Sequence, residues 1–219
     1  MSLAARARKL WLSEGPMGLS SGLVRLVRTA LRHLYFRADF FVHEFDLSLL
    51  PVEYPFAIME EVEIHVVESD ADARRLVCSG YEDFRQVVPL SGYRLGNGAV
   101  GFCAYIDRHV AHTGWIGLTE RAKRSFDPLP YRVDFDCGEG VSGGSWTFPA
   151  YRGRGIYRYV MWHRLWYLRE HTCTVCLNAT EVGNTAGIRG QVVFPSHIVG
   201  TLRVSRILGI EHSRLESVP

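Results

Sequence analysis

Polar and hydrophobic residues alternate with a period of two over several short segments, which is the pattern of a β-strand with one buried face. Glu61–Val67 is the clearest of these segments, because Val62, Ile64 and Val66 share one face while charged residues and a histidine share the other. Strands are also predicted over Phe40–Leu47, Ala99–Ile106, His109–Leu118, Tyr131–Asp136, Ser142–Phe148, Thr172–Asn178 and Ile198–Leu208, the last as one strand or a pair.

Other segments have the spacing of amphipathic helices. Ser69 is a good N-cap with acidic residues behind it, which predicts a helix that runs to about Phe84. A longer helix is predicted from Ile156 to about Glu170, and a short helical turn over Thr185–Gln191. Near the N-terminus, Leu23–Tyr35 places leucines and valines on one face and arginines on another.

The order of these elements predicts how the strands pair. Asp107 and Arg108 alone separate two strands, so those strands should form an antiparallel hairpin. A strand, the helix from Ile156 and a further strand follow one another, which is the usual way to make a parallel pair. We therefore expect an α/β protein of the α+β type, with a mixed sheet flanked by helices.

Composition and charge narrow the class of protein. The 219 residues are 47% hydrophobic and 22% charged, as in a soluble globular domain, and a net charge of +2 does not indicate nucleic acid as a partner. No apolar run is long enough to cross a bilayer, and the odd number of cysteines, five, favours a reducing compartment. We expect a cytoplasmic protein without a bound metal.

Charge is unevenly distributed along the chain. Residues 1–38 carry seven basic residues and one acidic residue, whereas the remainder is net negative. This contrast predicts a basic helical extension over 1–38 and a separate globular domain over 39–219. The basic helix either packs on the domain, or docks on an anionic membrane surface or an acidic carrier protein. Assembly as a homodimer also stays open.

The segment with the strongest chemical signal is Arg152-Gly153-Arg154-Gly155, between a predicted strand and a predicted helix. Free backbone N–H groups and the helix dipole attract anions at such a helix start, and glycines let the backbone approach a phosphate closely. The two arginines add charge with a geometry suited to phosphate oxygens. The sequence therefore predicts a phosphate-binding loop.

Two well-known phosphate loops do not fit this segment. The Walker pattern requires a Gly-Lys-Ser/Thr that is absent, and Arg158 stands where the dinucleotide fingerprint needs a third glycine. The segment instead resembles the acyl-CoA pyrophosphate loop of the GNAT (GCN5-related N-acetyltransferase) superfamily, Arg/Gln-x-x-Gly-x-Gly/Ala, often preceded by Pro-x-Tyr-Arg-Gly. The residues that match are Pro149, Tyr151, Arg152, Gly153, Gly155 and Ile156, and Tyr157 departs where the family has glycine or alanine.

A second segment and the order of the elements extend the resemblance over about residues 61–210. Asn184 with Ala186, followed by Val193-Phe194, resembles the segment that closes the GNAT domain. The resemblance implies a GNAT fold, a mixed twisted sheet with a central splayed parallel strand pair and flanking helices. It also implies transfer of an acyl group, most often acetyl, from acetyl-CoA or another acyl-CoA to a small-molecule or peptide amine.

Carried over residue by residue, the resemblance assigns the cofactor site. Trp146, Thr147 and Phe148 would flank the pantetheine and the thioester. The backbone of the loop, made by Arg152, Gly153, Arg154, Gly155, Ile156 and Tyr157, would bind the pyrophosphate. Asn184 would contact the cofactor or a reacting water.

The catalytic acid and base are less well marked. Members of the family often place a tyrosine about seven residues after the asparagine, and this chain has Gln191 there. Tyr151 or Tyr157 could take its place as the general acid. Candidate bases are Glu139 and Asp136, beside the strand that enters the site, with Asp134 and His112 behind them.

Two alternative functions keep the fold. One is an enzyme similar to N-acyl amino acid synthases, which takes long acyl chains from an acyl carrier protein, and the other is a catalytically silent acyl-CoA-binding module. A Gly-x-Ser-x-Gly pattern at Gly140–Gly144 suggests a hydrolase, but a strand follows where that mechanism needs a helix. Cys173 and Cys176 would point to opposite sides of a strand, so they do not predict a metal site.

Overall fold

A computed structural model describes residues 35–57, 61–207 and 210–217. The predicted helix Leu23–Tyr35 and the basic extension 1–38 lie outside these residues, apart from the few that begin the first strand. Two compact units divide the described chain: residues 40–201 form one, and residues 35–39 with 202–216 form the other. Every candidate site residue lies in the first unit.

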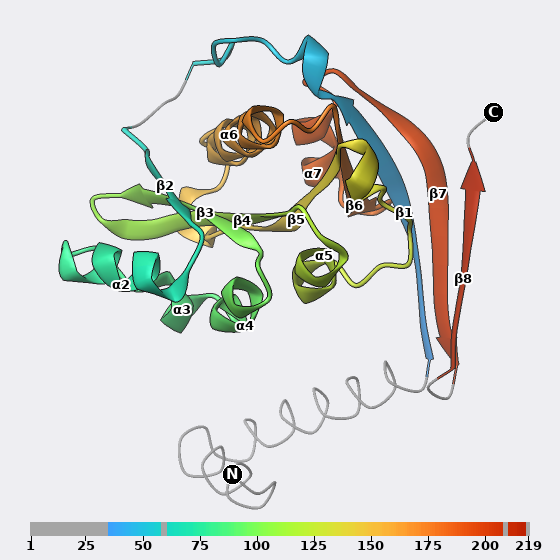
Figure 1. The fold of residues 1–219 in the computed structure, drawn as a ribbon, viewed down its shortest axis with the longest axis horizontal. Coiled ribbons are helices and arrows are strands. Elements are labelled where there is room, and N and C mark those ends of the chain that lie inside the picture. Colours follow the sequence, from blue (N-terminus) through green and yellow to red (C-terminus); the bar gives the residue numbers. More distant parts are fainter. Residues whose placement is uncertain (1–34, 58–60, 208–209, 218–219) are drawn as a thin grey trace, which may run out of the picture. The chain divides into compact units, whose positions relative to one another are not determined.

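The strands form one mixed sheet in the order β2-β3-β4-β5-β6-β1-β7-β8 (Figure 1). Pairing is antiparallel between β2 and β3, β3 and β4, β4 and β5, and β1 and β6, whereas β5 and β6 are parallel. The strands are β1 (Tyr35–Asp46), β2 (Glu63–Val67), β3 (Val100–Ile106), β4 (His109–Gly117), β5 (Glu139–Thr147), β6 (Val175–Glu181), β7 (Ser196–Ile207) and β8 (Ile210–Ser217).

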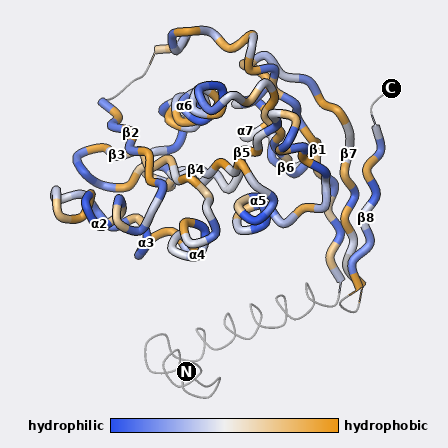
Figure 2. The backbone as a smooth tube through the Cα atoms, in the orientation of Figure 1, coloured by the Kyte–Doolittle hydropathy of each residue, from blue (hydrophilic) through white to orange (hydrophobic). Residues whose placement is uncertain are grey.

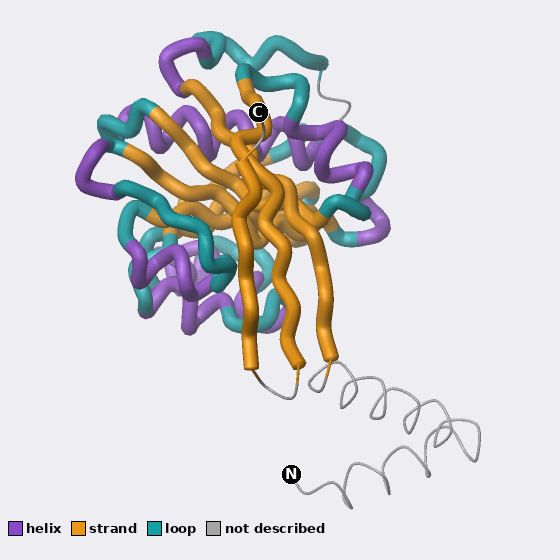
Figure 3. The backbone as a smooth tube through the Cα atoms, turned by 90° about the vertical axis from the view of Figure 1, so that its right-hand side faces the viewer, coloured by secondary structure: helices purple, strands orange, loops and turns teal. Residues whose placement is uncertain are grey.

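Helices cover both faces of the sheet in the unit of residues 40–201 (Figures 1 and 3). Helices α6 (Ile156–Glu170) and α7 (Thr185–Gln191) lie on one face, and α2 (Asp70–Cys78), α3 (Phe84–Val87), α4 (Ser91–Gly96) and α5 (Glu120–Phe126) lie on the other. Short 3-10 turns, η1 (Leu47–Leu49), η2 (Phe135–Cys137) and η3 (Pro149–Tyr151), join some of the elements.

Successive side chains of β3 point to opposite faces of the sheet, which explains why two hydrophobic cores form. Phe102 and Ala104 belong to the core on the α6 side, while Cys103 and Tyr105 belong to the core under α2–α5. Hydrophobic and hydrophilic residues are mixed along the helices, as elements with one buried side require (Figure 2). A sheet that is buried on both faces fixes the strands, and with them the positions of the site residues.

Several predicted elements are confirmed. The hairpin β3–β4 turns at Asp107 and Arg108, whose φ values of 50° and 64° are those of a two-residue hairpin turn. Helix α6 has the predicted bounds, and Ser69 caps α2 through a capping box with Asp72. The crossover β5–α6–β6 gives the predicted parallel pair.

Two predictions about elements are wrong, and one strand was not predicted. The helix after Ser69 ends at Cys78, because Gly80 turns the chain with a φ of 87° and α3 starts only at Phe84. The last strand is followed by an unpredicted strand, β8.

The second wrong prediction is the strand Tyr131–Asp136, which is a loop that leads into η2. Its polar groups bond locally instead of to a neighbouring strand: the hydroxyl of Tyr131 donates to Asp127, and the N–H of Asp134 donates to Glu139 Oε2 at 2.6 Å. Alternating hydrophobicity alone does not distinguish such a loop from a strand.

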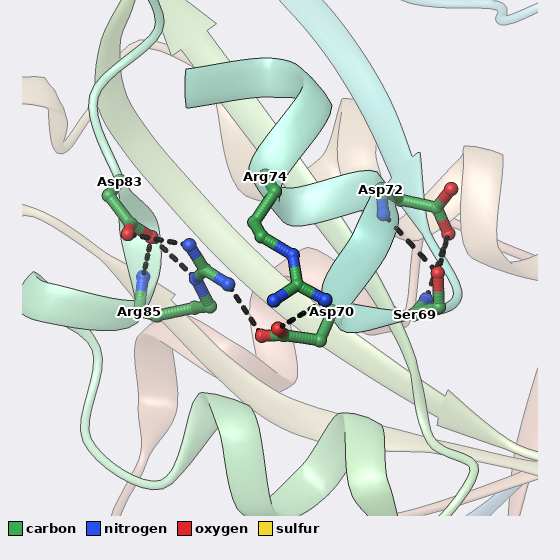
Figure 4. A network of polar contacts seen from close by, with 6 residues as sticks. All are labelled: Ser69, Asp70, Asp72, Arg74, Asp83 and Arg85. Carbon is green, nitrogen blue, oxygen red and sulfur yellow. Dashed lines mark hydrogen bonds and ion pairs between the residues drawn. The ribbon is translucent and has the colours of Figure 1, made fainter. Parts of the chain in front are cut away.

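An ion-pair network joins α2 to α3 (Figure 4). The guanidinium of Arg85 lies between Asp83, at 2.8 Å, and Asp70, which also pairs with Arg74 at 3.2 Å. Hydrogen bonds from Arg85 hold the pKa of the Asp83 carboxyl below its usual value. The side chain of Arg85 is 20% exposed and contacts two carboxylates, whereas that of Arg74 is 68% exposed and pairs with Asp70 alone.

Replacing Arg85 by methionine is expected to lower the free energy of unfolding at pH 7 by about 1–2 kcal/mol, because two carboxylates lose a partly buried partner. The pKa of Asp83 is lowered in the folded state, so this contribution is complete above the unfolded pKa of about 3.9 and disappears as the pH falls through the folded value. Urea unfolding at pH 7 and pH 3 measures both effects. Arg74→Met is the matched control, and an equal loss in both variants would contradict the prediction.

Candidate active site

The candidate site is a cleft where two parallel strands separate. Strands β5 and β6 pair from Glu139 and Val175 only as far as Val141 and Leu177, although β5 continues to Thr147 and β6 to Glu181. Beyond the last pair, a cleft of about 860 Å³ is lined by residues 143–147 of β5 and residues 178–181 of β6. The middle of the sheet therefore has an opening with unpaired strand edges on both sides.

A β-bulge in β5 accounts for the separation. Thr113 of β4 pairs with Trp146, but Trp115 pairs with Gly143, so Gly144 and Ser145 together oppose one residue of β4. A bulge of this kind bends its strand and leaves one residue without a ladder partner. Gly144 has a φ of 57°, a conformation that glycine adopts without strain. The bulge thus turns β5 away from β6 and leaves backbone groups facing the cleft.

A buried arginine lies behind the bulge on the α6 side. Arg164 is fully buried, and its guanidinium donates to the carbonyl oxygen of Gly143 at 3.2 Å. Gly114 makes room for it, because a Cβ there would lie 2.8 Å from Arg164 Cζ. No carboxylate among the described residues pairs with Arg164, and burial lowers its pKa. The bulge therefore carries a positive charge close to its backbone.

The outer end of the cleft is the glycine-rich loop before α6. Gly153 and Gly155 have φ values of 78° and 81°, so both occupy the left-handed region, and α6 begins at Ile156. The first N–H groups of a helix have no acceptor within the helix. Arg152, Arg154, Arg158 and Arg189 also line the cleft, and Glu181 is the one acidic residue in its lining. This end of the cleft is suited to a ligand with several negative charges.

Polar side chains close the inner end of the cleft. The amide of Asn178 donates to the carbonyl oxygen of Ser142 at 2.6 Å, which links β6 to β5 one residue beyond their last pair. Gln191 Nε2 lies 3.0 Å from Asn178 Oδ1 and 2.7 Å from Thr180 Oγ1. All three side chains are at least 94% buried. These bonds fix the point at which the strands separate.

Tyr157 reaches this inner network from the first turn of α6. Its hydroxyl lies 3.1 Å from Gln191 Nε2, and burial raises its pKa. The ring packs against α7 at Gly190, where a Cβ would come within 2.5 Å of it. Tyr157 therefore presents a protonated phenol beside the glutamine that occupies the expected tyrosine position.

His112 of β4 lies on the other side of Tyr157, with ring centroids 6.0 Å apart. Its Nδ1 is 2.7 Å from the hydroxyl of Thr147. Burial and the charge of Arg164 hold the pKa of His112 well below its usual value. The imidazole is therefore neutral, which favours a role in packing and hydrogen bonding over one as a cation.

Most of the predicted cofactor residues line the cleft: Trp146, Thr147, Arg152, Gly153, Arg154, Gly155, Ile156, Tyr157 and Asn184. Asn184 also caps α7, because its side chain accepts from the N–H of Gly187 at 3.0 Å. Phe148 is outside the lining; its N–H donates to the carbonyl of Ala111, and its ring packs against the core under α2–α5.

The predicted catalytic residues are spread over a wider region. Tyr151 lines the cleft with Arg154 stacked on its ring. Glu139 stands at the paired end of β5, four residues or about 13 Å from Gly143 at the usual rise of a strand. Asp136 is exposed in η2. The structure thus brings Tyr151 to the cleft but not Glu139 or Asp136.

Sequence reasoning missed Asn178, Thr180 and Arg164. Arg164 had a signal: it lies on the buried side of α6, four residues from both Val160 and Leu168, so a charge interrupts an apolar face. Asn178 and Thr180 had none, because the residues that tie them into the site, Ser142 and Gln191, are distant in sequence.

The structure adds two observations on metals and membranes. Cys173 and Cys176 do not face opposite sides of a strand as expected, because β6 begins only at Val175 and both residues belong to the core beside α6. The described residues contain no group of three histidines, cysteines or acidic residues placed to hold a metal. Among the helices of those same residues, none is long and apolar enough to cross a membrane.

Comparison with solved structures finds similar folds at low sequence identity. A GNAT-family protein from Novosphingobium aromaticivorans has a TM-score of 0.52 at 14% identity over 84% of this chain. The glucosamine N-acetyltransferase region of a fungal multi-domain β-N-acetylglucosaminidase has a TM-score of 0.52 at 13% over 85%. A tandem GNAT protein from the clavulanic acid biosynthesis pathway has a TM-score of 0.50 at 16% over 81%.

This chain spans 66%, 23% and 55% of the length of those three structures. No protein-family model matches the sequence. No curated protein matches it either.

Proposed function

Because this chain has the GNAT fold, we propose that it is an N-acyltransferase that moves an acyl group from acyl-CoA to an amine. One observation carries the proposal: the parted strands β5 and β6 enclose a cleft that ends on a cationic, glycine-rich loop at the start of α6. A cleft between strands suits an extended chain, and the loop suits a pyrophosphate.

In this proposal the ligand runs from the loop to the inner end of the cleft. The pyrophosphate binds the backbone of Arg152–Ile156, and the pantetheine lies along β5 like an added strand. Trp146 and Thr147 flank it, and Asn184 contacts it from α7. The thioester then lies at the bulge, where the backbone N–H groups of β5 are nearest.

The proposed reaction is a direct transfer. The amine nitrogen attacks the thioester carbonyl carbon, and a backbone N–H at the bulge donates to the oxyanion that forms. The carbon–sulfur bond then breaks, and the thiolate takes the proton of the Tyr157 hydroxyl. Water receives the proton that the amine loses, because neither Glu139 nor Asp136 lines the cleft and Glu181, which does, stands three residues or about 10 Å beyond Asn178. The phenolate of Tyr157 is later protonated by water.

We propose acetyl-CoA as the donor in preference to long-chain acyl donors. A long alkyl chain requires an apolar channel, since its burial is what stabilises its binding. Apart from tyrosine rings, the cleft is lined mostly by glycines, arginines and other polar residues, with Trp146, Ile156, Ala179 and Ala186 as the apolar members. The basic helix that would dock a carrier protein lies outside the described residues.

Replacing Arg152 and Arg154 together by alanine is expected to weaken CoA binding more than tenfold, because two cations beside the pyrophosphate are lost. Calorimetry with CoA, acetyl-CoA and a long-chain acyl-CoA measures the affinities. Arg124→Ala with Arg132→Ala is the matched control, since it removes two exposed arginines that do not line the cleft. Unchanged affinity in the first variant would refute the assignment of the loop.

Release of free CoA thiol from acetyl-CoA and a panel of amines tests the reaction itself. Turnover with any amine supports the transferase. Tight CoA binding without turnover on any amine favours the silent binding module instead.

The free state of all five cysteines supports the further proposal of a reducing, cytoplasmic location.

A further inference from the structure

An arginine on the other face of the sheet has no counterion among the described residues. Arg94 of α4 is half-buried, and its Nε is buried without a hydrogen-bond partner. Its guanidinium stacks on the fully buried ring of Trp115, 5.2 Å from the centroid, and forms no ion pair with any described residue. Burial lowers the pKa of the Arg94 guanidinium. Keeping a partly buried cation unpaired is costly, which points to a partner that the described residues do not supply.

Arg94 lies beside the bulge of β5. A Cβ on Gly144 would be 3.7 Å from Arg94 Nη1 and 3.0 Å from the ring of Trp115. Gly144 also lines the cleft. The guanidinium is therefore next to the backbone where the thioester is proposed to react, on the face opposite to Arg164.

The nearby charged groups already have partners. Asp127 lies beside Gly143, but its carboxylate accepts from the hydroxyl of Tyr131 and the N–H of Leu129. Arg121, next to α4 in space, donates to Asn97 at 2.9 Å and to the carbonyl of Gly96 at 3.0 Å. Arg94 differs from both, since its hydrogen-bonding groups are directed at no described acceptor.

We propose that Arg94 binds the carboxylate of the acceptor, and that the acceptor is a free α-amino acid. The inference rests on the proposed acyl transfer. A guanidinium pairs with a carboxylate through two parallel hydrogen bonds, which fix both position and orientation. The amine must reach the thioester at the bulge while the carboxylate reaches Arg94 beside it, so only a few bonds separate the two groups. An α-amino acid has this spacing.

Matched substrate pairs test the proposal with acetyl-CoA as donor: tyrosine and tyramine, histidine and histamine, and tryptophan and tryptamine. The wild type is expected to show at least tenfold higher kcat/KM for the amino acid of its preferred pair. The methyl ester of that amino acid should lose the same factor, which tests the charge without any substitution. Equal values for amino acid, ester and amine would overturn the proposal.

Substitutions of Arg94 test whether this residue causes the preference for the amino acid over the amine. Arg94→Met is expected to bring the ratio of amino acid to amine close to one, with unchanged CoA affinity. Arg94→Lys should keep part of the preference, because it keeps the charge but loses the bidentate geometry. Arg121→Met is the control and should keep the full ratio. A ratio that Arg94→Met leaves intact would overturn the proposal.

Two further experiments cover a carboxylate that belongs to the acyl donor and the case in which no amine reacts. If succinyl-CoA reacts faster than acetyl-CoA with the amines, and Arg94→Met removes that advantage, the carboxylate belongs to the donor and the acceptor assignment is overturned. If no amine reacts although CoA binds, the acyl transfer fails, and calorimetry of the CoA-loaded protein with the amino acids decides the site. Binding that Arg94→Met abolishes supports the carboxylate site, and no binding overturns it.

Discussion

Tyr157→Phe is expected to lower kcat about 100-fold while the KM for acetyl-CoA stays nearly constant, because a positioned general acid contributes at least about this factor. The substitution removes the hydroxyl that lies by Gln191 and keeps the ring that packs on Gly190. Binding and folding should therefore persist while the departing thiolate loses its proton donor. Steady-state kinetics with a thiol-release assay measures both constants.

The identity of the leaving group provides the decisive control. A thioester of a more acidic thiol leaves without protonation, so such a donor should restore most of the lost rate in Tyr157→Phe. Tyr151→Phe tests the other tyrosine in the cleft, and Tyr159→Phe tests a phenol of α6 outside its lining. An equal loss of rate on every donor, or a larger loss in Tyr151→Phe, would contradict the role of Tyr157.

Gly190→Ala is expected to lower the free energy of unfolding by about 1–3 kcal/mol, the usual cost of overpacking. The new Cβ would lie 2.5 Å and 2.6 Å from two carbons of the Tyr157 ring, and a rigid ring cannot yield as a flexible chain does. Glycine to alanine inside a helix otherwise stabilises by up to about 1 kcal/mol. The contact with Tyr157 therefore decides the sign. Thermal or urea unfolding measures it.

Two variants check that explanation. Gly92 of α4 is also a helical glycine, and a Cβ there would meet no atom within 4 Å, so Gly92→Ala should be neutral or stabilising. With Tyr157→Ala as the background, Gly190→Ala should cost nothing relative to Tyr157→Ala alone, because the ring that clashes is gone. Equal destabilisation at both glycines, or the same cost of Gly190→Ala with and without the ring, would show that the ring is not the cause.

Local signals were sufficient for the elements that hold the cofactor loop. Gly153 and Gly155 predicted a turn, and both have left-handed backbone in the structure. The periodicity after Ile156 predicted α6. Both features depend on residues that are close in sequence. The same kind of reasoning failed for Tyr131–Asp136, because hydrogen bonds to Asp127 and Glu139 hold a loop whose hydrophobic pattern is that of a strand.

The interior of the site was beyond such reasoning. Gln191 and Tyr157 are 34 residues apart, and Asn178 and Ser142 are 36 apart, so only the folded sheet brings each pair together. Tyr157 departs from the loop pattern of the family, and its packing partner, Gly190, could not be identified from sequence. In space the two residues are complementary: one lacks a side chain where the other has a ring.

The separation of β5 and β6 after Val141 and Leu177 sets an evolutionary constraint on this chain. Each additional rung between these strands would strengthen the sheet, yet it would fill the space in which acyl-CoA is proposed to bind. The carboxamide of Asn178 acts as a substitute rung, closing the sheet at one point and allowing it to open above. Selection for stability alone would therefore tend to erase the site, since the most stable form of this sheet is one that no longer binds.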